Sequence, residues 1–411
     1  MAIYAPDHRV TIKRAATGYQ PEDISLDILA ISINKGYAKA AGGFQITMTF
    51  NRRIEGKRYD ETIRPNDIVH IELDAGDGKG LRSRMIGLVD RVARQVSVNP
   101  DQSVTRRVNI MGMDFGKMLL RHNCVKDIQP MIGTPGPAKA ARLAEGMIFS
   151  GTPREITQTI FDTLLIKQLR WVEPYMKFSS PDADGDRDRW ETYDETVTET
   201  TGSVWAALKR SANEPFNAMT TETHGGVLHV IIEKYPFHAK TGKLTREPLH
   251  AISDDHIREE NIGVDDSDRV TYVWHRVNAV TIYNQGANFT YMYPDLVQYE
   301  KEMIERHGFI PFYPESNFVP PGYIPKDQAE KSHKDLIAER TNEFWERNRR
   351  NHEYEMGSIT IKGNPDIKAG DGVHVASTDM EYFVESYTER YVWGQDYQTT
   401  LNVTRGQKHG A

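Results

Sequence analysis

Hydrophobic and polar residues alternate with a period of two near both ends of the chain. In the stretch FQITMTFNR (44–52), Phe44, Ile46, Met48 and Phe50 alternate with polar or small residues. This period is typical of a strand with one buried face. Similar stretches follow at 67–74, 84–98 and 106–114, and the Gly-rich segment 74–80 predicts a hairpin loop between the first two. Five or six short consecutive strands indicate a small antiparallel barrel or sandwich.

The pattern changes to a helical period from about residue 116. Ile156, Ile160, Phe161, Leu164 and Leu165 share one stripe of a helix predicted over 153–171. The Thr152-Pro153 pair is typical of a helix start, because proline is well tolerated in the first turn. A second helix is predicted over 203–215, and a strand over 227–237 follows the Gly-Gly turn at 225–226. These elements predict a mixed α/β region.

The remaining third of the chain mixes several patterns. A β-rich stretch is predicted over 269–286, followed by a connector rich in proline and aromatic residues and a polar helix over 326–357. The last 54 residues return to the alternation of strands.

The two β-rich ends share a frame. IRPNDIVHI (63–71) and IKAGDGVHV (367–375) both place Ile, a basic residue, Asp, Val, His and a β-branched residue at matching positions. Residues 84–94 can be set against 381–391, and 105–112 against 399–406. The first block runs 49 residues from Ile63 to Gly112 and the second 39 from Ile367 to Gly406, a difference of 10 that the loop at 74–80 can absorb. Two interpretations stay open: the general likeness of antiparallel meanders, or two copies of one small barrel.

The second interpretation gives a specific domain organisation. A chain of 411 residues is long enough for two to four domains. We expect an α+β fold, mainly β, in which two similar small antiparallel β-barrels flank an inserted mixed α/β region. The predicted parts are 1–125 (first barrel), 126–245 (mixed α/β), 246–355 (β-rich segment, connector and polar helix) and 356–411 (second barrel).

Three blocks of the sequence give a resemblance. They are PNDIVHIEL…MIGLVDRVARQVSV…RRVNIMGMDFGKMLL, then SVWAALKRSANEPFNAMTTETHGGVLHVIIEKYPF, then GSITIKGNPDIKAGDGVHV…EYFVESYTERYVWGQDYQTTLNVTRG. In order and spacing the chain resembles the baseplate hub proteins of contractile phage tails, a family that includes the late control protein D type and is related to the hub part of type six secretion spike proteins. The blocks cover about two-thirds of the chain. The acidic insert at 181–196 and the connector at 288–325 depart from the family pattern.

The resemblance implies a structural role in a virion. A hub of this family is a homotrimeric ring at the tip of the tail, made in the cytoplasm of the bacterial host. Its two barrels, here about 44–112 and 358–406, would imitate consecutive subunits of the hexameric tail tube, and its other face would receive the trimeric spike and neighbouring baseplate proteins. Two equivalent modules in each chain give a threefold body a pseudo-sixfold surface. The particle could be a phage, a phage-tail-like bacteriocin or an injection machine.

Composition and charge agree with a structural role. Lys and Arg number 51 against 58 Asp and Glu, a net charge of −7, so no overall basic field attracts nucleic acid. An acidic or neutral lumen would let DNA pass without phosphate contacts that retain it. The single cysteine excludes an internal disulfide and a Cys-rich metal site, and no cofactor is expected. No stretch of the sequence has the length of a signal peptide core or a membrane span, so no membrane anchor is expected.

Several candidate sites match a chemistry only in part. Asp182, Asp184, Asp186 and Asp188 alternate like half a calcium loop, but Arg187 and Tyr193 replace the required Gly and Glu, which favours a solvated loop. The stretch GDGKG (76–80) lacks the spacer and hydroxyl of a phosphate loop. His352 and Glu353 have no second His at zinc-protease spacing. Cys124 is expected to be a buried structural thiol rather than a nucleophile.

Two further features keep alternatives open. The acidic pairs Glu259-Glu260 and Asp265-Asp266 could serve a tail-associated peptidoglycan hydrolase, although adjacent residues on a strand point apart. We therefore expect no enzyme activity and no catalytic, cofactor-binding or metal-binding residues. A receptor- or glycan-binding tail protein is the other alternative. An aromatic cluster is expected either to pack within the connector or to dock on a neighbouring subunit; it comprises Tyr291, Tyr293, Tyr299, Phe309, Phe312, Tyr313, Phe318 and Tyr323.

Overall fold

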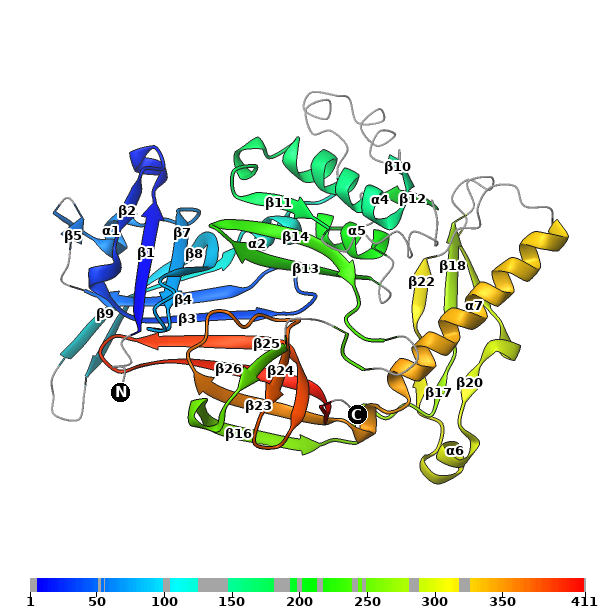
Figure 1. Cartoon of the computed structure of the whole chain (residues 1–411). Helices are drawn as coiled ribbons and strands as arrows, with labels where there is room; N and C mark the ends of the chain where they lie inside the picture. Colours follow the sequence, from blue (N-terminus) through cyan, green and yellow to red (C-terminus); the bar gives the residue numbers. More distant parts are fainter. Residues whose placement is uncertain are drawn as a thin grey trace, which may run out of the picture.

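The computed structural model is mainly β and is organised around one 13-stranded sheet (Figure 1). It describes residues 6–50, 53–54, 56–98, 104–124, 147–180, 193–197, 202–212, 217–238, 243–245, 249–280, 288–317 and 326–409. Within these ranges, no helix combines the length and the apolar character that crossing a membrane requires. The expected α+β fold, mainly β, with a mixed α/β region inserted between two similar antiparallel units is confirmed, and the strands of the two predicted small barrels pair within one continuous sheet.

The N-terminal strands form the first repeat. Its strands are β1 (Asp7–Lys13), β2 (Pro21–Asp23), β3 (Ile28–Gly36), β4 (Gly43–Thr49), β7 (Ile68–Asp74), β8 (Arg82–Val98) and β9 (Val104–Asp114). They pair in the order β3-β4-β9-β8-β7-β1-β2. The alternation predicted at 44–50 is confirmed, because Phe44, Ile46 and Met48 are buried in the core. Strand β1 alternates in the same way, with Val10 and Ile12 buried.

The C-terminal strands form the second repeat. They are β23 (Glu355–Lys362), β24 (Gly372–Val375), β25 (Met380–Val392) and β26 (Asp396–Lys408), joined by β15 (Leu249–Ile252) and β16 (Ile257–Val264) from the middle of the chain. Strand β15 pairs with β24 in parallel, and β16 pairs antiparallel with β23. The stretch 249–264 therefore belongs to the same sheet as the C-terminal strands.

The inserted region packs two helices against a small sheet. Helix α4 (Pro153–Ile160) starts as predicted, because the Thr152 side chain caps the Glu155 amide, and it continues into a π-helical turn (Phe161–Ile166). All five residues of the predicted stripe are buried. Helix α5 (Val204–Ser211) is capped by Ser203, and β11 (Met176–Ser179), β14 (Val227–Lys234) and β13 (Asn217–His224) form the sheet. Strands β10 (Met147–Gly151) and β12 (Tyr193–Val197) pair separately. Helix α2 (Gly116–Arg121) links this region to β9.

The last region surrounds a long helix, α7 (Lys326–Asn348). The β-rich stretch predicted over 269–286 contains β17 (Tyr272–Val273) and β18 (Arg276–Val280), and its residues 281–286 lie outside the described ranges. Strand β17 pairs with β20 (Gln298–Tyr299) and β21 (Pro311–Phe312), and β18 pairs with β19 (Asn288–Met292) and β22 (Glu315–Asn317) in a separate sheet. A short helix, α6 (Lys301–His307), follows β20. Helix α7 ends at Asn348 rather than at 357, because residues 355–362 pair with β26 instead. Figure 1 shows α7 at the end of the molecule opposite the first repeat.

Candidate assembly interface

Each repeat contains a turn of the same type, built around an aspartate. The Asp67 carboxylate accepts a hydrogen bond from the Arg64 amide at 2.7 Å, and the Asp371 carboxylate accepts one from the Lys368 amide at 2.8 Å. The residue before each aspartate is in the left-handed region, with φ of 71° at Asn66 and 95° at Gly370. The frame that the two segments share in the sequence therefore corresponds to the same type of turn in both repeats.

The strand after each turn is entered in the same way. The Asp67 carbonyl accepts from the Val89 amide at 2.9 Å, and the Asp371 carbonyl accepts from the Val384 amide at 2.9 Å. A register shift follows directly in both strands, between Val89 and Arg91 in β8 and between Val384 and Ser386 in β25. Because an irregularity at matching positions is unexpected of two unrelated meanders, the internal repeat is confirmed and chance likeness is wrong.

The match extends through four strands of each repeat. Strands β3-β4-β9-β8 correspond to β16-β23-β26-β25, in the same order and direction. The pairing of β3 with β4 shifts between Ile28 and Ala30, and the pairing of β16 with β23 shifts at the equivalent place, between Ile257 and Glu259. The paired residues of these four strands therefore have assigned counterparts in the other repeat.

The repeats meet edge to edge at the joint between β3 and β25 (Figure 1). Seven residues of each strand pair antiparallel, from Ser386 opposite Gly36 to Val392 opposite Ala30. On the inner side of the joint Ile31, Ile33 and Tyr391 are buried. Two units of one design thus share a continuous sheet, a neighbour relation that the local sequence pattern does not reveal.

A buried ion pair locks the joint from within. Arg84 Nε of the first repeat donates to Glu389 Oε2 of the second at 2.9 Å, and its other nitrogens donate to the carbonyls of Pro365 at 2.5 Å and Ile367 at 3.1 Å. The Tyr397 hydroxyl donates to the second Glu389 oxygen at 2.6 Å. Every hydrogen bond of this charged pair crosses to the second repeat or stays within it, so the network depends on the two repeats being held together.

The buried environment shifts the pKa values of Arg84 and Tyr397. Burial acts to lower the pKa of Arg84, but the Glu389 carboxylate outweighs burial and the pKa is raised. Burial raises the pKa of Tyr397 well above its usual range, and the adjacent Glu389 adds to the effect. The raised pKa values keep Arg84 charged and the Tyr397 phenol neutral around neutral pH.

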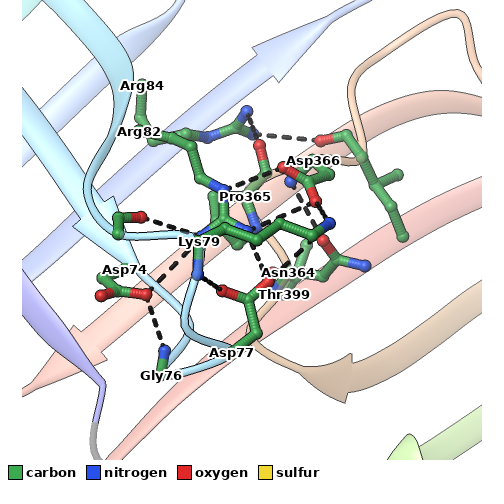
Figure 2. A network of polar contacts seen from close by, with 12 residues as sticks. Asp74, Gly76, Asp77, Lys79, Arg82, Arg84, Asn364, Pro365, Asp366 and Thr399 are labelled. Atoms are coloured by element: carbon green, nitrogen blue, oxygen red, sulfur yellow. Dashed lines mark hydrogen bonds and ion pairs between the residues drawn. The ribbon is translucent and has the colours of Figure 1, made fainter.

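The Gly-rich loop considered for phosphate binding has a structural role (Figure 2). It connects β7 to β8 as the predicted hairpin, and Lys79 Nζ donates to Asp366 of the second repeat at 2.7 Å. Arg82 Nε lies 3.0 Å from the other Asp366 oxygen, and Arg82 also pairs with Asp77. Burial tends to raise the pKa of Asp366, but the contacts with Lys79 and Arg82 lower it overall. The loop therefore adds a second set of ion pairs between the two repeats.

The sheet face opposite the core is polar and mostly uncharged. Side chains on this face bond across strands: Thr47 to Asn109 at 3.0 Å, Asn109 to Gln95 at 2.8 Å and Asn402 to Ser386 at 2.8 Å. The Thr360 and Thr400 hydroxyls repeat this at 3.0 Å. Charged side chains on this face include the cations Arg91, Arg107, Lys362 and Arg390 and the anions Glu259 and Asp396. The net charge of −7 is therefore not concentrated on this face.

The weighed candidate residues are scattered. Cys124 is buried, and burial raises the pKa of its thiol to about 11, which suits the predicted structural thiol. His352 lies in a short 3-10 turn after α7, and burial lowers its pKa. Glu259 and Glu260 lie on β16 opposite Thr360 and Ile359, on alternate faces of the strand. The calcium-like series Asp182, Asp184, Asp186 and Asp188 lies outside the described residues. Among the residues that the structure describes, no three or more His, Cys, Asp or Glu side chains are grouped as metal ligands.

The aromatic cluster is divided between packing and exposure. Phe312 packs against Phe344 of α7, and Tyr272 lies edge-on to Phe309 and Tyr313. Phe309 is nevertheless 74% exposed and Tyr299 60%. Phe318 and Tyr323 lie outside the described residues, as does the side chain of Tyr291. Part of the aromatic cluster is therefore packed within the protein, as the first interpretation expects. Another part is exposed and accessible to a neighbouring subunit, as the second interpretation expects.

Sequence reasoning missed the joint residues Arg84 and Glu389. A weak indication was present, because Glu389 stands between Tyr387 and Tyr391 in the inward frame of its strand. A charge at an inward position needs a buried partner. The partner is 305 residues away, so the sequence alone does not identify it.

Solved structures of other proteins share this architecture at the level of the fold. No protein-family model and no curated protein sequence matches the chain. Among solved structures, the 43 kDa tail protein of prophage MuSo2 from Shewanella oneidensis superposes with a TM-score of 0.55 at 14% identity, covering 98% of this chain and 98% of its own. The tail protein from Neisseria meningitidis MC58 gives 0.50 at 12% identity, with 97% and 96% covered. The chain has the fold of phage tail proteins.

The similarity extends over nearly the whole chain, because 97–98% of this chain and 96–98% of the two neighbours are covered. A component of the type VI secretion system of E. coli aligns with a TM-score of 0.44 at 10% identity, over 93% of this chain and 74% of its own. The two tail proteins from Shewanella oneidensis and Neisseria meningitidis confirm, at the level of the fold, the resemblance inferred from three sequence blocks.

Proposed function

We propose that this chain is the baseplate hub of a phage or phage-tail-like contractile particle, located at the tip of the tail. Three copies form a ring whose six repeats present a pseudo-sixfold face to the hexameric tail tube, while the threefold body receives the trimeric spike and other baseplate proteins. The role is binding and symmetry adaptation, without catalysis.

The joint between β3 and β25 is the observation that carries this proposal. It sets two equivalent units side by side in one sheet, as neighbouring subunits stand in a ring. Repetition of one heterologous contact closes into a ring when the rotation between units divides a full turn. Because each chain supplies two positions, three chains supply six.

The polar face of the sheet supports a passage for DNA. Its amide and hydroxyl side chains satisfy one another across the strands, so they offer few free donors to phosphate. Binding to DNA gains strength with each phosphate that a cation neutralises. A lining whose polar side chains are already paired with one another would hold the duplex weakly and let it slide through.

The size and symmetry of the purified particle test the proposal. Light scattering coupled to gel filtration is expected to give three times the 46.9 kDa mass of the chain, and negative-stain projections are expected to show threefold density with sixfold modulation. A protein that stays monomeric at high concentration and does not join its tube and spike partners contradicts the hub. Lysis of peptidoglycan in a zymogram would instead favour a hydrolase.

A further inference from the structure

Among the strand edges that the described part of the chain leaves unpaired, two belong to strands at positions equivalent to those of the joint between the repeats. Strand β16 ends the order of the large sheet and pairs with β23 on one side only. The far half of β8, from Arg91 to Val98, pairs with β9, while its pairing with β7 stops at Leu88. Both edges are exposed, with Val96 60%, Val98 69% and Val264 63% accessible. Long edges with unused hydrogen-bonding groups are templates for another strand.

The internal joint shows what such an edge binds. In the correspondence between repeats, β25 is the counterpart of β8 and β3 is the counterpart of β16. The contact equivalent to the β3–β25 joint would pair β16 with the far half of β8, and this contact is not formed within one chain. Within one chain these two strands stand at opposite ends of the run β16-β23-β26-β25-β3-β4-β9-β8.

We propose that β16 of one copy of this chain pairs antiparallel with residues 91–98 of β8 in the next copy, in the register of the internal joint. The occupant of each edge is thus a second copy. This proposal rests on the proposed function, since it names the seam between neighbouring chains of the ring.

The register can be transferred residue by residue. The joint pairs Ser386 with Gly36, Tyr387 with Lys35 and Arg390 with Ser32. The matched register shifts convert these pairs into Arg91 with Asp265, Val92 with Val264 and Gln95 with Asn261.

These three pairs are chemically complementary. They join opposite charges, two β-branched apolar side chains and two amides, all of which stabilise cross-strand contacts. A shift by one residue would place Val264 opposite Arg91 or Ala93 and would turn the apolar pairs to opposite faces.

The charge around the two edges is complementary as well. Glu259, Glu260 and Asp265 make the β16 edge acidic, whereas Arg91, Arg94 and Arg107 make the β8–β9 ribbon basic. Arg94 already lies 3.3 Å from Asp60 but is 61% exposed, so it remains accessible to Glu260, its diagonal neighbour in the proposed register. Two copies meeting head to tail therefore attract, while two identical edges repel.

Cysteine cross-linking tests the register. The variant Gln95→Cys with Asn261→Cys places one thiol on each edge, and mild oxidation with copper phenanthroline is expected to give covalent dimers and trimers on a non-reducing denaturing gel. Directly opposed side chains have the spacing that a disulfide needs. The matched control, Ala93→Cys with Asn261→Cys, shifts the pair by two residues on the same face and is expected to cross-link at least tenfold less.

The outcomes separate the two proposals. A trimer by light scattering that does not cross-link through 95 and 261, or that cross-links equally through 93 and 261, overturns the register and leaves the hub standing. A monomeric protein overturns both. As a second readout, Arg91→Asp is expected to weaken trimer formation at least tenfold, and addition of Asp265→Arg is expected to restore it. Absence of rescue contradicts the pairing of 91 with 265.

Discussion

Arg84 and Glu389 form an ion pair across the joint of two repeats, with 2.9 Å between Nε and Oε2 and only 5% and 1% of the residues exposed. They are 305 residues apart in the sequence. Arg84 also lies over the Tyr387 ring, 4.8 Å from its centre. The Arg84 side chain thus contacts three parts of the second repeat. It contacts strand β25 through the Tyr387 ring, the preceding turn through two backbone carbonyls, and the Glu389 carboxylate.

Loss of one partner of this pair is expected to destabilise the whole sheet. Arg84→Met leaves the buried Glu389 carboxylate without its cation and the Pro365 and Ile367 carbonyls without this donor, which costs about 3–5 kcal/mol of the free energy of unfolding. The double variant with Glu389→Leu is expected to cost less than the sum of the single variants, because the uncompensated charge is gone. Denaturant titration measures both.

An exposed pair of similar geometry serves as the control. Arg9 Nε lies 2.5 Å from Glu72, but the Arg9 side chain is 48% exposed. Arg9→Met is expected to cost about 0–1 kcal/mol. Equal losses for Arg84→Met and Arg9→Met would contradict a locking role for the buried pair.

The repeated turn predicts an exchange of residues between repeats. Asn66 is exposed and has the left-handed conformation that Gly370 adopts in the second repeat, so Asn66→Gly is expected to keep the fold at a cost below about 1 kcal/mol. Asn66→Val places a β-branched side chain in the same conformation and is expected to cost about 1–2 kcal/mol or more. Thermal unfolding ranks the two, and the reverse order would speak against equivalence of the turns.

His275 is expected to make stability sensitive to acid. Burial, with the nearby Arg340 charge, lowers the pKa of His275 to about 3. The folded chain keeps this ring neutral while the unfolded chain protonates it near 6.5, so stability is present above pH 6.5 and is lost as the pH falls toward 3. The loss reaches about 2 kcal/mol at pH 5, at 1.36 kcal/mol per pH unit.

The variant His275→Gln isolates this effect. It is expected to show a flatter dependence of unfolding free energy on pH between 6.5 and 3, followed by the fluorescence of Trp345, which is buried in the same cluster as Phe344. A pH dependence that is unchanged by the substitution would assign acid sensitivity to other groups.

Cys124 is expected to be unreactive in the folded protein. Its thiol is buried and its pKa is about 11, so little thiolate is present at pH 8. A chromogenic thiol reagent is expected to label it only after addition of denaturant. Labelling within minutes under native conditions would show that the inserted region opens locally.

The parts of the fold that the sequence predicts are those in which local pattern and burial coincide. Strand β4 alternates because one face lies in the core, and α4 carries a stripe because one side is covered. Strand β16 escaped prediction because IREENIGV has exposed residues on both faces and so has no alternation. Helix α7 is shorter than its pattern, since pairing of β23 with a distant strand overrides the local preference.

The candidate interface was predictable only in outline. The frame around Asp67 and Asp371 identifies the repeat, because a turn constrains residue types locally. The joint itself depends on which strands become neighbours. The sequence of β3 or of β25 alone contains no pattern that identifies the other strand as its partner.

The joint also has a consequence for how an assembly of this chain begins. Strands β3 and β25 are tethered to one another, so their contact forms at an effective concentration that dilution does not change. In a ring of six positions only three contacts would then depend on the concentration of protein. A host cell would need to make far fewer copies before rings close than it would for six separate subunits.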